Sequence, residues 1–317
     1  MRILVTGGAG FIGSNIVENL LKDANVSFVR VLDNLATGSL KNLSEFTNNP
    51  KFQLIIGDIR DVETCIKACE NIDAITHQAA LGSVPRSIND PLTSNNVNIT
   101  GMINMMWAAK QNGIRRFVFA ASSSTYGDSP TLPKVENVIG KPLSPYAITK
   151  YVNELYADIF SKFYGIEYVG LRYFNVFGPK QSPNGAYAAV IPLFMNYAIQ
   201  QKAPTINGPG DNSRDFTFVA NAVQANILAL FTQNTEAINQ IYNVACGEQN
   251  NLVQLNNYIK EISGSKADAI HGPERAGDVK HSLADISKIK QHLGYNPTIK
   301  IKEGLKITYD WYVKNMN

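Results

Sequence analysis

Short apolar runs alternate with segments of helical periodicity through the first half of the chain. The apolar runs predict buried strands, at 2–5, 28–32, 52–56, 73–77, 116–121 and 168–172. The periodic segments predict helices, at 14–21, 61–69, about 92–112 and about 145–164. Repeated strand–helix units predict an α/β fold with a doubly wound parallel sheet of the Rossmann type. Ligands of such sheets bind beyond the carboxyl ends of the strands.

The regular spacing ends near residue 179. Glycine, proline and asparagine become frequent in 183–185 and 207–212, and the later elements follow no repeated unit. We therefore expect residues 1–179 to form one domain around the parallel sheet and residues 180–317 to form mainly a smaller, mixed α/β lobe. Residues around 217–245 are expected to return to the main sheet.

A glycine-rich turn, Thr6–Gly13, follows the first predicted strand. Gly8, Gly10 and Gly13 fit the G-x-G-x-x-G spacing, and Gly7, Gly10 and Gly13 fit G-x-x-G-x-x-G. Because a strand precedes this turn and a helix follows it, the segment predicts a dinucleotide site with the pyrophosphate at the helix N-terminus.

Asp33 ends the second predicted strand, twenty residues after Gly13. An acidic side chain at this place accepts hydrogen bonds from the adenosine ribose. The carboxylate also repels a 2′-phosphate, and the following Asn34 and Leu35 supply no arginine to bind one. NAD is therefore favoured over NADP.

Charge and composition narrow the class of protein. The 317 residues carry a net charge of +3 without a dense basic block, which gives no argument for a nucleic-acid partner. No apolar run reaches transmembrane length, and Met1 runs directly into the first strand, so we expect no membrane partner and a cytoplasmic enzyme. The three cysteines form no zinc pattern with the four histidines.

Tyr146 and Lys150 stand four residues apart at the start of a predicted helix. Residues at this spacing share a helix face, and a nearby ammonium favours phenolate over phenol. The pair therefore predicts a tyrosine that acts as a general base with a lowered pKa. Tyr-x-x-x-Lys alone is a weak pattern, but here it follows a dinucleotide motif and the serine cluster Ser122–Ser124.

Several further motifs accompany these two. They are Gly57–Arg60, Gln78–Ala80, Ser122–Gly127, Ser144–Tyr146 with Lys150, Leu171–Asn175, Ser213–Asp215 and Arg275–Val279. As a set they resemble the extended short-chain dehydrogenase/reductases, and most closely the UDP-galactose 4-epimerases, including the UDP-N-acetylglucosamine 4-epimerase group. The resemblance covers essentially the whole chain.

The resemblance implies roles for individual residues. Ser122, Tyr146 and Lys150 match the catalytic positions. The implied NAD-binding residues are Gly7, Gly10, Phe11, Ile12, Gly13, Asp33, Asn34, Asp58, Ile59, Gln78, Ala79, Ala80, Asn98, Tyr146, Lys150 and Tyr173. The implied UDP-sugar-binding residues are Ser83, Arg86, Ser122, Ser123, Asn175, Ala189, Val190, Arg214, Arg275, Asp278 and Ser282. No metal is implied.

Some of these positions have simpler interpretations. Arg214 and Arg275 also suit surface ion pairs, and Asn98 also suits a helix residue that satisfies backbone groups. The resemblance further implies a homodimer, formed through the helices at about 92–112 and 145–164. An apolar stripe on the first of these, Ile99, Ile103, Met106 and Trp107, fits that interface or the core equally well.

The resemblance also bears on the reaction. The related 4,6-dehydratases carry Asp-Glu where this chain has Ser123-Ser124, so the chain lacks their proton shuttle and simple C4 epimerisation is expected. Ser282 falls where members strict for plain hexoses carry a bulky aromatic residue, which favours UDP-N-acetylglucosamine and UDP-N-acetylgalactosamine. UDP-glucose/UDP-galactose and UDP-N-acetylglucosaminuronic acid, with Arg86 as a partner for the carboxylate, stay open as alternatives. A non-catalytic NAD-binding scaffold is the alternative of another class.

Overall fold

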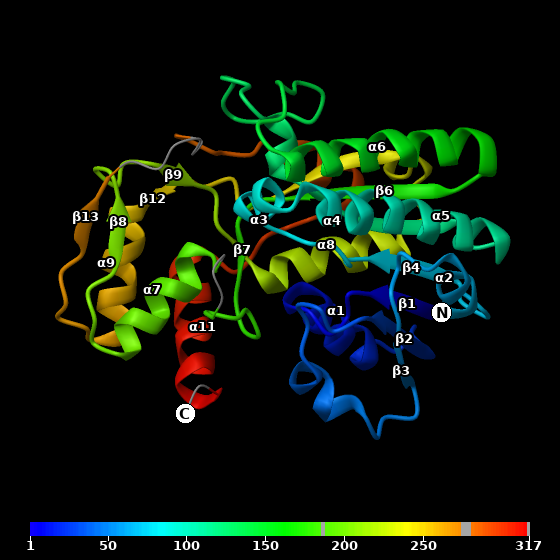
Figure 1. Ribbon diagram of the computed structural model, residues 1–317, viewed down its shortest axis with the longest axis horizontal. Helices are drawn as coiled ribbons and strands as arrows, with labels where there is room; N and C mark the ends of the chain where they lie inside the picture. Colours follow the sequence, from blue (N-terminus) through cyan, green and yellow to red (C-terminus); the bar gives the residue numbers. More distant parts are fainter. Residues whose placement is uncertain (185–187, 274–279, 316–317) are drawn as a thin grey trace.

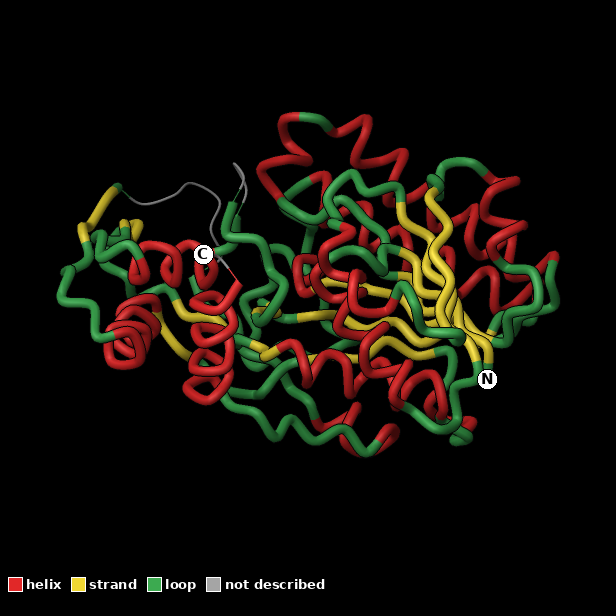
Figure 2. Tube along the Cα trace, turned by 90° about the horizontal axis from the view of Figure 1, so that it is seen from below, coloured by secondary structure: helices red, strands yellow, loops and turns green. Residues whose placement is uncertain are grey.

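The computed structural model describes residues 1–184, 188–273 and 280–315. Its centre is a seven-stranded, all-parallel sheet in the order β11-β6-β5-β4-β1-β2-β3 (Figures 1 and 2). These strands are β1 (Arg2–Thr6), β2 (Phe28–Asp33), β3 (Phe52–Ile56), β4 (Ala74–His77), β5 (Arg116–Ser122), β6 (Glu167–Tyr173) and β11 (Gln240–Val244). The predicted doubly wound parallel sheet is confirmed.

Helices cover both faces of this sheet. One face carries α1 (Phe11–Lys22) and α8 (Val219–Phe231); the other carries α2 (Val62–Ala68), α5 (Gly101–Gln111) and α6 (Pro145–Tyr164) (Figure 1). The alternation of strand side chains explains the two cores. In β1, Ile3 and Val5 join the core beneath α1 and α8, whereas Leu4 joins the core beneath α2 and α5.

The predicted helix at 92–112 is interrupted. It consists of α4 (Pro91–Asn95), a π-helical turn (Asn96–Thr100) and α5. Of the stripe predicted there, Met106 is fully buried, and Ile103 and Trp107 pack against the core.

The remaining elements form a second lobe beside the carboxyl ends of the strands. Its helices α7, α9 and α11 lie together on the left of Figure 1, next to short two-stranded sheets. The bounds are α7 (Val190–Ile199), β8 (Thr205–Asn207), β9 (Ser213–Arg214), β12 (Asn250–Asn251), α9 (Leu252–Ser263), β13 (Ile270–Gly272) and α11 (Ile301–Asn315). The other elements are α3 (Val84–Asn89), β7 (Val176–Phe177), β10 (Thr217–Phe218) and α10 (Ser287–Leu293).

Within the described residues, no helix is long and apolar enough to cross a membrane. The predicted substrate-binding residues Arg275 and Asp278 lie outside the described part of the chain.

Candidate functional site

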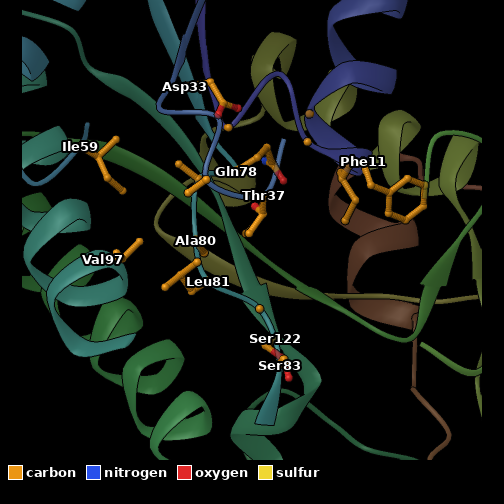
Figure 3. A pocket seen from close by; sticks show the side chains of 18 of the residues that line it. Phe11, Asp33, Thr37, Ile59, Gln78, Ala80, Leu81, Ser83, Val97 and Ser122 are labelled. Carbon is orange, nitrogen blue, oxygen red and sulfur yellow. The ribbon is translucent and has the colours of Figure 1, made fainter. Parts of the chain in front are cut away.

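A cavity of about 610 Å³ lies at the carboxyl ends of the central strands and extends toward the second lobe (Figure 3). Most of the predicted site residues line it. They are Gly7, Gly10, Phe11, Ile12, Gly13, Asp33, Asn34, Ile59, Gln78, Ala79, Ala80, Ser83, Ser122, Tyr146, Lys150, Tyr173, Asn175 and Ala189. The sequence motifs therefore meet in one place, although they are spread over 183 positions of the chain from Gly7 to Ala189.

The glycine-rich turn packs so tightly that side chains cannot enter it. Gly7 has φ +66°, and a Cβ on it would lie 2.7 Å from the nitrogen of Ala79. A Cβ on Gly13 would lie 2.2 Å from the carbonyl oxygen of Gly7. These contacts let α1 begin directly behind the turn, so that backbone rather than side chains faces the cavity.

The N-terminus of α1 suits an anion. Its N-cap, Gly10, has no side chain to satisfy the first N–H groups, and the helix dipole places partial positive charge there. This arrangement fits the pyrophosphate of a dinucleotide.

Asp33 lies buried at the end of β2 and orders the loops around it. Its carboxylate accepts hydrogen bonds from the N–H groups of Ala9 (2.9 Å) and Leu35 (2.8 Å). Because each carboxylate oxygen has two acceptor sites, both can still accept a hydrogen bond from a ribose hydroxyl. The residues present therefore fit NAD.

Asp58 lies between two residues that line the cavity, Gly57 and Ile59. It is absent from the described lining of the cavity, and its carboxylate accepts a two-pronged pair of bonds from Arg60 (2.9 and 2.6 Å) and one from Asn34 (2.8 Å). The Arg60 guanidinium holds the pKa of Asp58 below its usual range. Ile59 and Arg60, which follow it, do line the cavity.

A polar cluster lies beside Gln78. The Tyr173 hydroxyl donates to the Gln78 side chain (3.0 Å) and accepts from Asn226 on α8 (2.7 Å). The same Gln78 donates to Thr76 (2.9 Å) and Asn226 (3.1 Å). Burial raises the pKa of Tyr173, so this phenol stays neutral and acts as a structural hydrogen-bonding group.

Ser122, Tyr146 and Lys150 come together at one wall of the cavity. Ser122 ends β5, and its Oγ accepts hydrogen bonds from the N–H (3.2 Å) and hydroxyl (2.9 Å) of Ser124. Lys150 lies one helical turn beyond Tyr146, with its Nζ 5.9 Å from the tyrosine ring centroid and bonded to the Ala120 carbonyl (2.8 Å). The predicted common face is confirmed.

The ionisation of the pair differs from the expectation. Burial raises the pKa of Tyr146, and the opposing interaction with the Ser122 side chain is smaller. Burial also lowers the pKa of Lys150 to about 8, against the raising effect of Glu154. The predicted lowering of the Tyr146 pKa is wrong for the protein by itself, because desolvation outweighs the lowering effect of the Ser122 side chain.

Asn98 lies in the π-helical turn and is buried. Its side chain bonds both backbone groups of Leu81 (2.8 and 3.2 Å) and the hydroxyl of Thr149 (3.1 Å). Thr149 in turn donates to the Tyr146 carbonyl (2.8 Å). In the structure, Asn98 thus joins the loop after β4 to the helix of Tyr146, as its simpler interpretation had it.

Asp215 organises the chain next to the cavity residue Asn175. This buried carboxylate accepts from the N–H groups of Cys246 (3.0 Å), Gly247 (3.0 Å) and Ala284 (3.3 Å), and its backbone carbonyl accepts from Asn175 (3.1 Å). Burial raises its pKa to about 6, and the backbone bonds oppose this. Asp215 therefore holds three separate segments of the chain together.

Several predicted substrate residues are absent from the described lining of the cavity. These are Arg86, Ser123, Val190, Arg214 and Ser282. Ser282 donates its N–H to the Ser213 carbonyl (3.0 Å), which places it next to Arg214. Val190 begins α7, directly after the cavity residue Ala189.

The sequence interpretation did not assign some residues that line the cavity. The main ones are Thr37, Arg60, Leu81, Thr93, Val97 and Gln181. Figure 3 shows Val97 and Leu81 facing the same space as Ile59 and Ala80. Arg60 and Leu81 adjoin quoted motifs, whereas Thr37, Thr93 and Gln181 lie in segments without a local signal.

Comparison with known proteins gives matches over the length of the chain. The family model described as GDP-mannose 4,6 dehydratase matches residues 4–308. A putative UDP-glucose 4-epimerase from Methanocaldococcus jannaschii is 38% identical over 317 residues, covering 99% of each protein.

Two solved structures are also similar. The UDP-N-acetylglucosamine 4-epimerase from Methanobrevibacter ruminantium, in complex with UDP-N-acetylmuramic acid, has a TM-score of 0.94 at 39% identity, covering 99% of each chain. The UDP-glucose 4-epimerase from Thermus thermophilus, in complex with NAD, has a TM-score of 0.88 at 35% identity, covering 99% of this chain and 100% of the other.

Proposed function

The chain belongs to the GDP-mannose 4,6-dehydratase family of extended short-chain dehydrogenase/reductases, and from this membership we propose which sugar it epimerises and which side chains act. It is a UDP-sugar 4-epimerase, and NAD is its cofactor. The proposed substrates are UDP-N-acetylglucosamine and UDP-N-acetylgalactosamine.

The turn at Gly7–Gly13 and the carboxylate of Asp33 would hold the NAD. When bound, NAD accepts a hydride from C4 of the sugar and returns it to the opposite face. The side chains of the protein supply orientation and proton transfer.

Tyr146 Oη takes the proton of the 4-hydroxyl and later returns it to the 4-oxygen. Ser122 hydrogen-bonds that oxygen, and the resulting 4-keto sugar turns while the nucleotide stays bound. Lys150 holds the nicotinamide ribose and favours the Tyr146 phenolate. Bound NAD would place the positive charge of its nicotinamide ring near Tyr146, which would favour the phenolate further.

One observation carries this assignment. Ser122, Tyr146 and Lys150 line the same cavity as the glycine-rich turn, so the acid–base groups and the cofactor cradle share one space. The side chains at 123 and 124 are serines, and elimination of the kind that 4,6-dehydratases perform lacks its carboxylate pair here. This favours epimerisation without loss of a sugar substituent.

The preference for N-acetylated sugars rests on a smaller feature. Ser282 has a short side chain on the segment that pairs with Ser213, beside Arg214. A small residue there leaves room for a 2-acetamido group. The Methanobrevibacter enzyme, which is named for UDP-N-acetylglucosamine, supports this choice, whereas the name of the Methanocaldococcus relative favours UDP-glucose.

The test is a substrate panel with wild-type protein and Tyr146→Phe. We expect the highest kcat/KM for UDP-N-acetylglucosamine, ahead of UDP-glucose and UDP-N-acetylglucosaminuronic acid. Tyr146→Phe should lower kcat by roughly 10³-fold, because general acid–base catalysis contributes 10²–10⁴-fold. UDP-sugar affinity should stay near that of the wild type.

Tyr156→Phe, an exposed position on the same helix, is the matched control and should keep full activity. Wild-type turnover by Tyr146→Phe would remove Tyr146 from the mechanism. If kcat/KM is highest for UDP-glucose, the proposed sugar is wrong but the epimerase assignment stays unchanged.

A homodimer through α6 is the second part of the proposal. Ile148, Leu155, Ile159 and Phe163 form an exposed apolar row on this helix, and Phe163 is 74% exposed. Large apolar side chains in a row are typical of an interface between subunits. The mass in solution, measured by light scattering, tests this; a monomer would refute it.

A further inference from the structure

The first turn of α6 needs acceptors for its N–H groups, because they have no partner within the helix. Pro145, at the first position, has no N–H. Ser144 caps the helix and accepts from Ala147 through its side chain (3.1 Å) and from Ile148 through its carbonyl (3.0 Å). The N–H of Tyr146 is thereby left for an acceptor from elsewhere in the chain.

Ser87 supplies that acceptor. Its Oγ lies 3.0 Å from the Tyr146 nitrogen, although the two residues are 59 positions apart. Ser87 is fully buried, and its hydroxyl donates to the Val84 carbonyl (2.8 Å) within α3. Since a hydroxyl has one proton, this bond commits the proton and turns a lone pair toward Tyr146. Ser87 thus completes the cap of α6 from another element.

The helix that carries Ser87 begins at the cavity. Ser83 and Ser122 both line the cavity (Figure 3). Its side chain caps α3 by accepting from Arg86 (3.3 Å), and its carbonyl accepts from the Ser87 N–H (3.2 Å). Ser83 has φ 123°, a conformation that is strained for any residue with a side chain. A short, hydrogen-bonded path therefore runs from the sugar side of the cavity to the backbone of Tyr146.

We propose that Ser87 is a positioning residue for the reaction: it fixes the first turn of α6 and so sets the Tyr146 hydroxyl against the sugar. This inference rests on the proposed role of Tyr146. Ser87 does not contact the reacting atoms, and because it is buried it does not contact solvent. It acts through one backbone N–H, and the N-terminal part of α3 with its cap Ser83 links that contact to whatever occupies the cavity beside Ser83.

The test compares Ser87→Ala with Ser94→Ala. Ser94 is a matched control, because it is buried in the adjoining α4 and its Oγ has no hydrogen-bond partner in the structure. In Ser87→Ala, amide exchange of the peptide containing Tyr146 should speed up by about tenfold, since one intramolecular hydrogen bond is lost. Its kcat should fall by roughly 10- to 100-fold, because small misplacements of a catalytic group have effects of this size.

KM for the UDP-sugar and the affinity for NAD should change by less than about twofold, as expected for loss of an interaction made only in the transition state. Ser87→Thr, which keeps the hydroxyl, should recover most of the exchange protection and of kcat. Ser94→Ala should match the wild type in all of these measurements.

Three results would overturn the proposal: unchanged amide exchange and kcat in Ser87→Ala, equal losses in Ser94→Ala, or a raised KM with an unchanged kcat. If Ser87→Ala does not fold, the decision passes to Ser87→Cys, which keeps the volume with a weaker acceptor and should give an intermediate kcat. Amide exchange reports on the contact whether or not Tyr146 is the base. A failed Tyr146→Phe test would show that Tyr146 is not the base, and it can therefore be distinguished from a failed Ser87→Ala test, which would show that Ser87 does not position Tyr146.

Discussion

The two ends of the cavity are built in different ways. The cofactor end consists largely of one short segment, Gly7–Gly13, with Asp33 at the end of the neighbouring strand, and it presents mainly backbone. The sugar end is collected from Ser83, Ser122, Tyr146, Asn175 and Ala189, which lie on separate elements. Buried polar side chains such as Ser87 and Asp215 hold these elements in place. Local chain geometry thus shapes one end, and long-range hydrogen bonds shape the other.

The largest effect is expected at the cofactor end. Gly13→Ala would place a Cβ 2.2 Å from the Gly7 carbonyl oxygen, which forces the turn or α1 to move. We expect NAD binding to be lost and stability to fall by about 1–3 kcal/mol or more, as for overpacked sites. Isothermal titration with NAD and thermal unfolding measure both quantities.

Gly264→Ala is a suitable control. Gly264 ends α9 at φ +69°, with open space around it. This change should cost about 1–2 kcal/mol of stability while leaving NAD affinity unchanged. Normal NAD binding by Gly13→Ala would show that the cofactor end of the cavity does not depend on the tight packing of the glycine-rich turn.

The next effect is expected at the sugar end, from Asp215→Asn. The amide keeps only one acceptor oxygen for the N–H groups of Cys246, Gly247 and Ala284. We expect a loss of about 1–3 kcal/mol, the cost of a buried unsatisfied polar group. In Asp215→Asn the affinity for UDP should fall, whereas the affinity for NAD should stay unchanged. An equal loss of both affinities would contradict the claim that the two ends of the cavity are built in different ways.

The same carboxyl group predicts a dependence on pH. Burial raises the pKa of Asp215 from 3.8 to about 6, so the folded protein binds this proton more tightly than the unfolded chain does. The contribution of Asp215 to stability should therefore decline as pH rises from about 4 through about 6, and then stay level. The change is on the order of 3 kcal/mol.

Denaturant unfolding of the wild type and Asp215→Asn from pH 4 to pH 8 isolates this contribution as a difference between the two proteins. Asp268→Asn, at an exposed ion pair with Lys260, should track the wild type. The free energy of unfolding of the wild type minus that of Asp215→Asn should fall over this range. A difference that rises with pH would show that the backbone N–H donors lower the pKa of Asp215 more than burial raises it.

The smallest effect is one of selectivity. If Ser282 leaves room for an acetamido group, Ser282→Tyr should cut kcat/KM for UDP-N-acetylglucosamine about tenfold more than for UDP-glucose, within the range that pocket shape contributes. Ser287→Tyr, at an exposed position beginning α10, should change neither value. Equal losses on both sugars in Ser282→Tyr would reject Ser282 as the selective residue.

The sequence predicted the cofactor end in detail because the relevant signals are local. The strand, the glycine spacing, the helix and Asp33 all lie within the first 33 residues, and the structure places them together. The common face of Tyr146 and Lys150 follows from helix geometry alone. For Asp58 the motif is equally local, but the motif did not reveal the bonds that its carboxylate accepts from Arg60 and Asn34.

The spacing of Tyr146 and Lys150 along the sequence did not predict how their pKa values change in the folded protein. The distance between Tyr146 and Lys150 along the chain indicates which charges meet, but not how much water both groups lose. Burial changes the pKa of each, and burial depends on packing from β5, α3 and the loop after β4. The contacts of Ser87 and Asp215 likewise join segments between 31 and 69 positions apart.

The sequence by itself determined the strands of the sheet, the glycine-rich turn and the common face of Tyr146 and Lys150, because each depends on residues close to one another along the chain. Only the tertiary structure decided which polar groups fix Tyr146 and Lys150 in place and which other side chains line the cavity with them. Those choices depend on hydrogen bonds and desolvation between distant segments, and no spacing along the chain encodes how much solvent such contacts exclude.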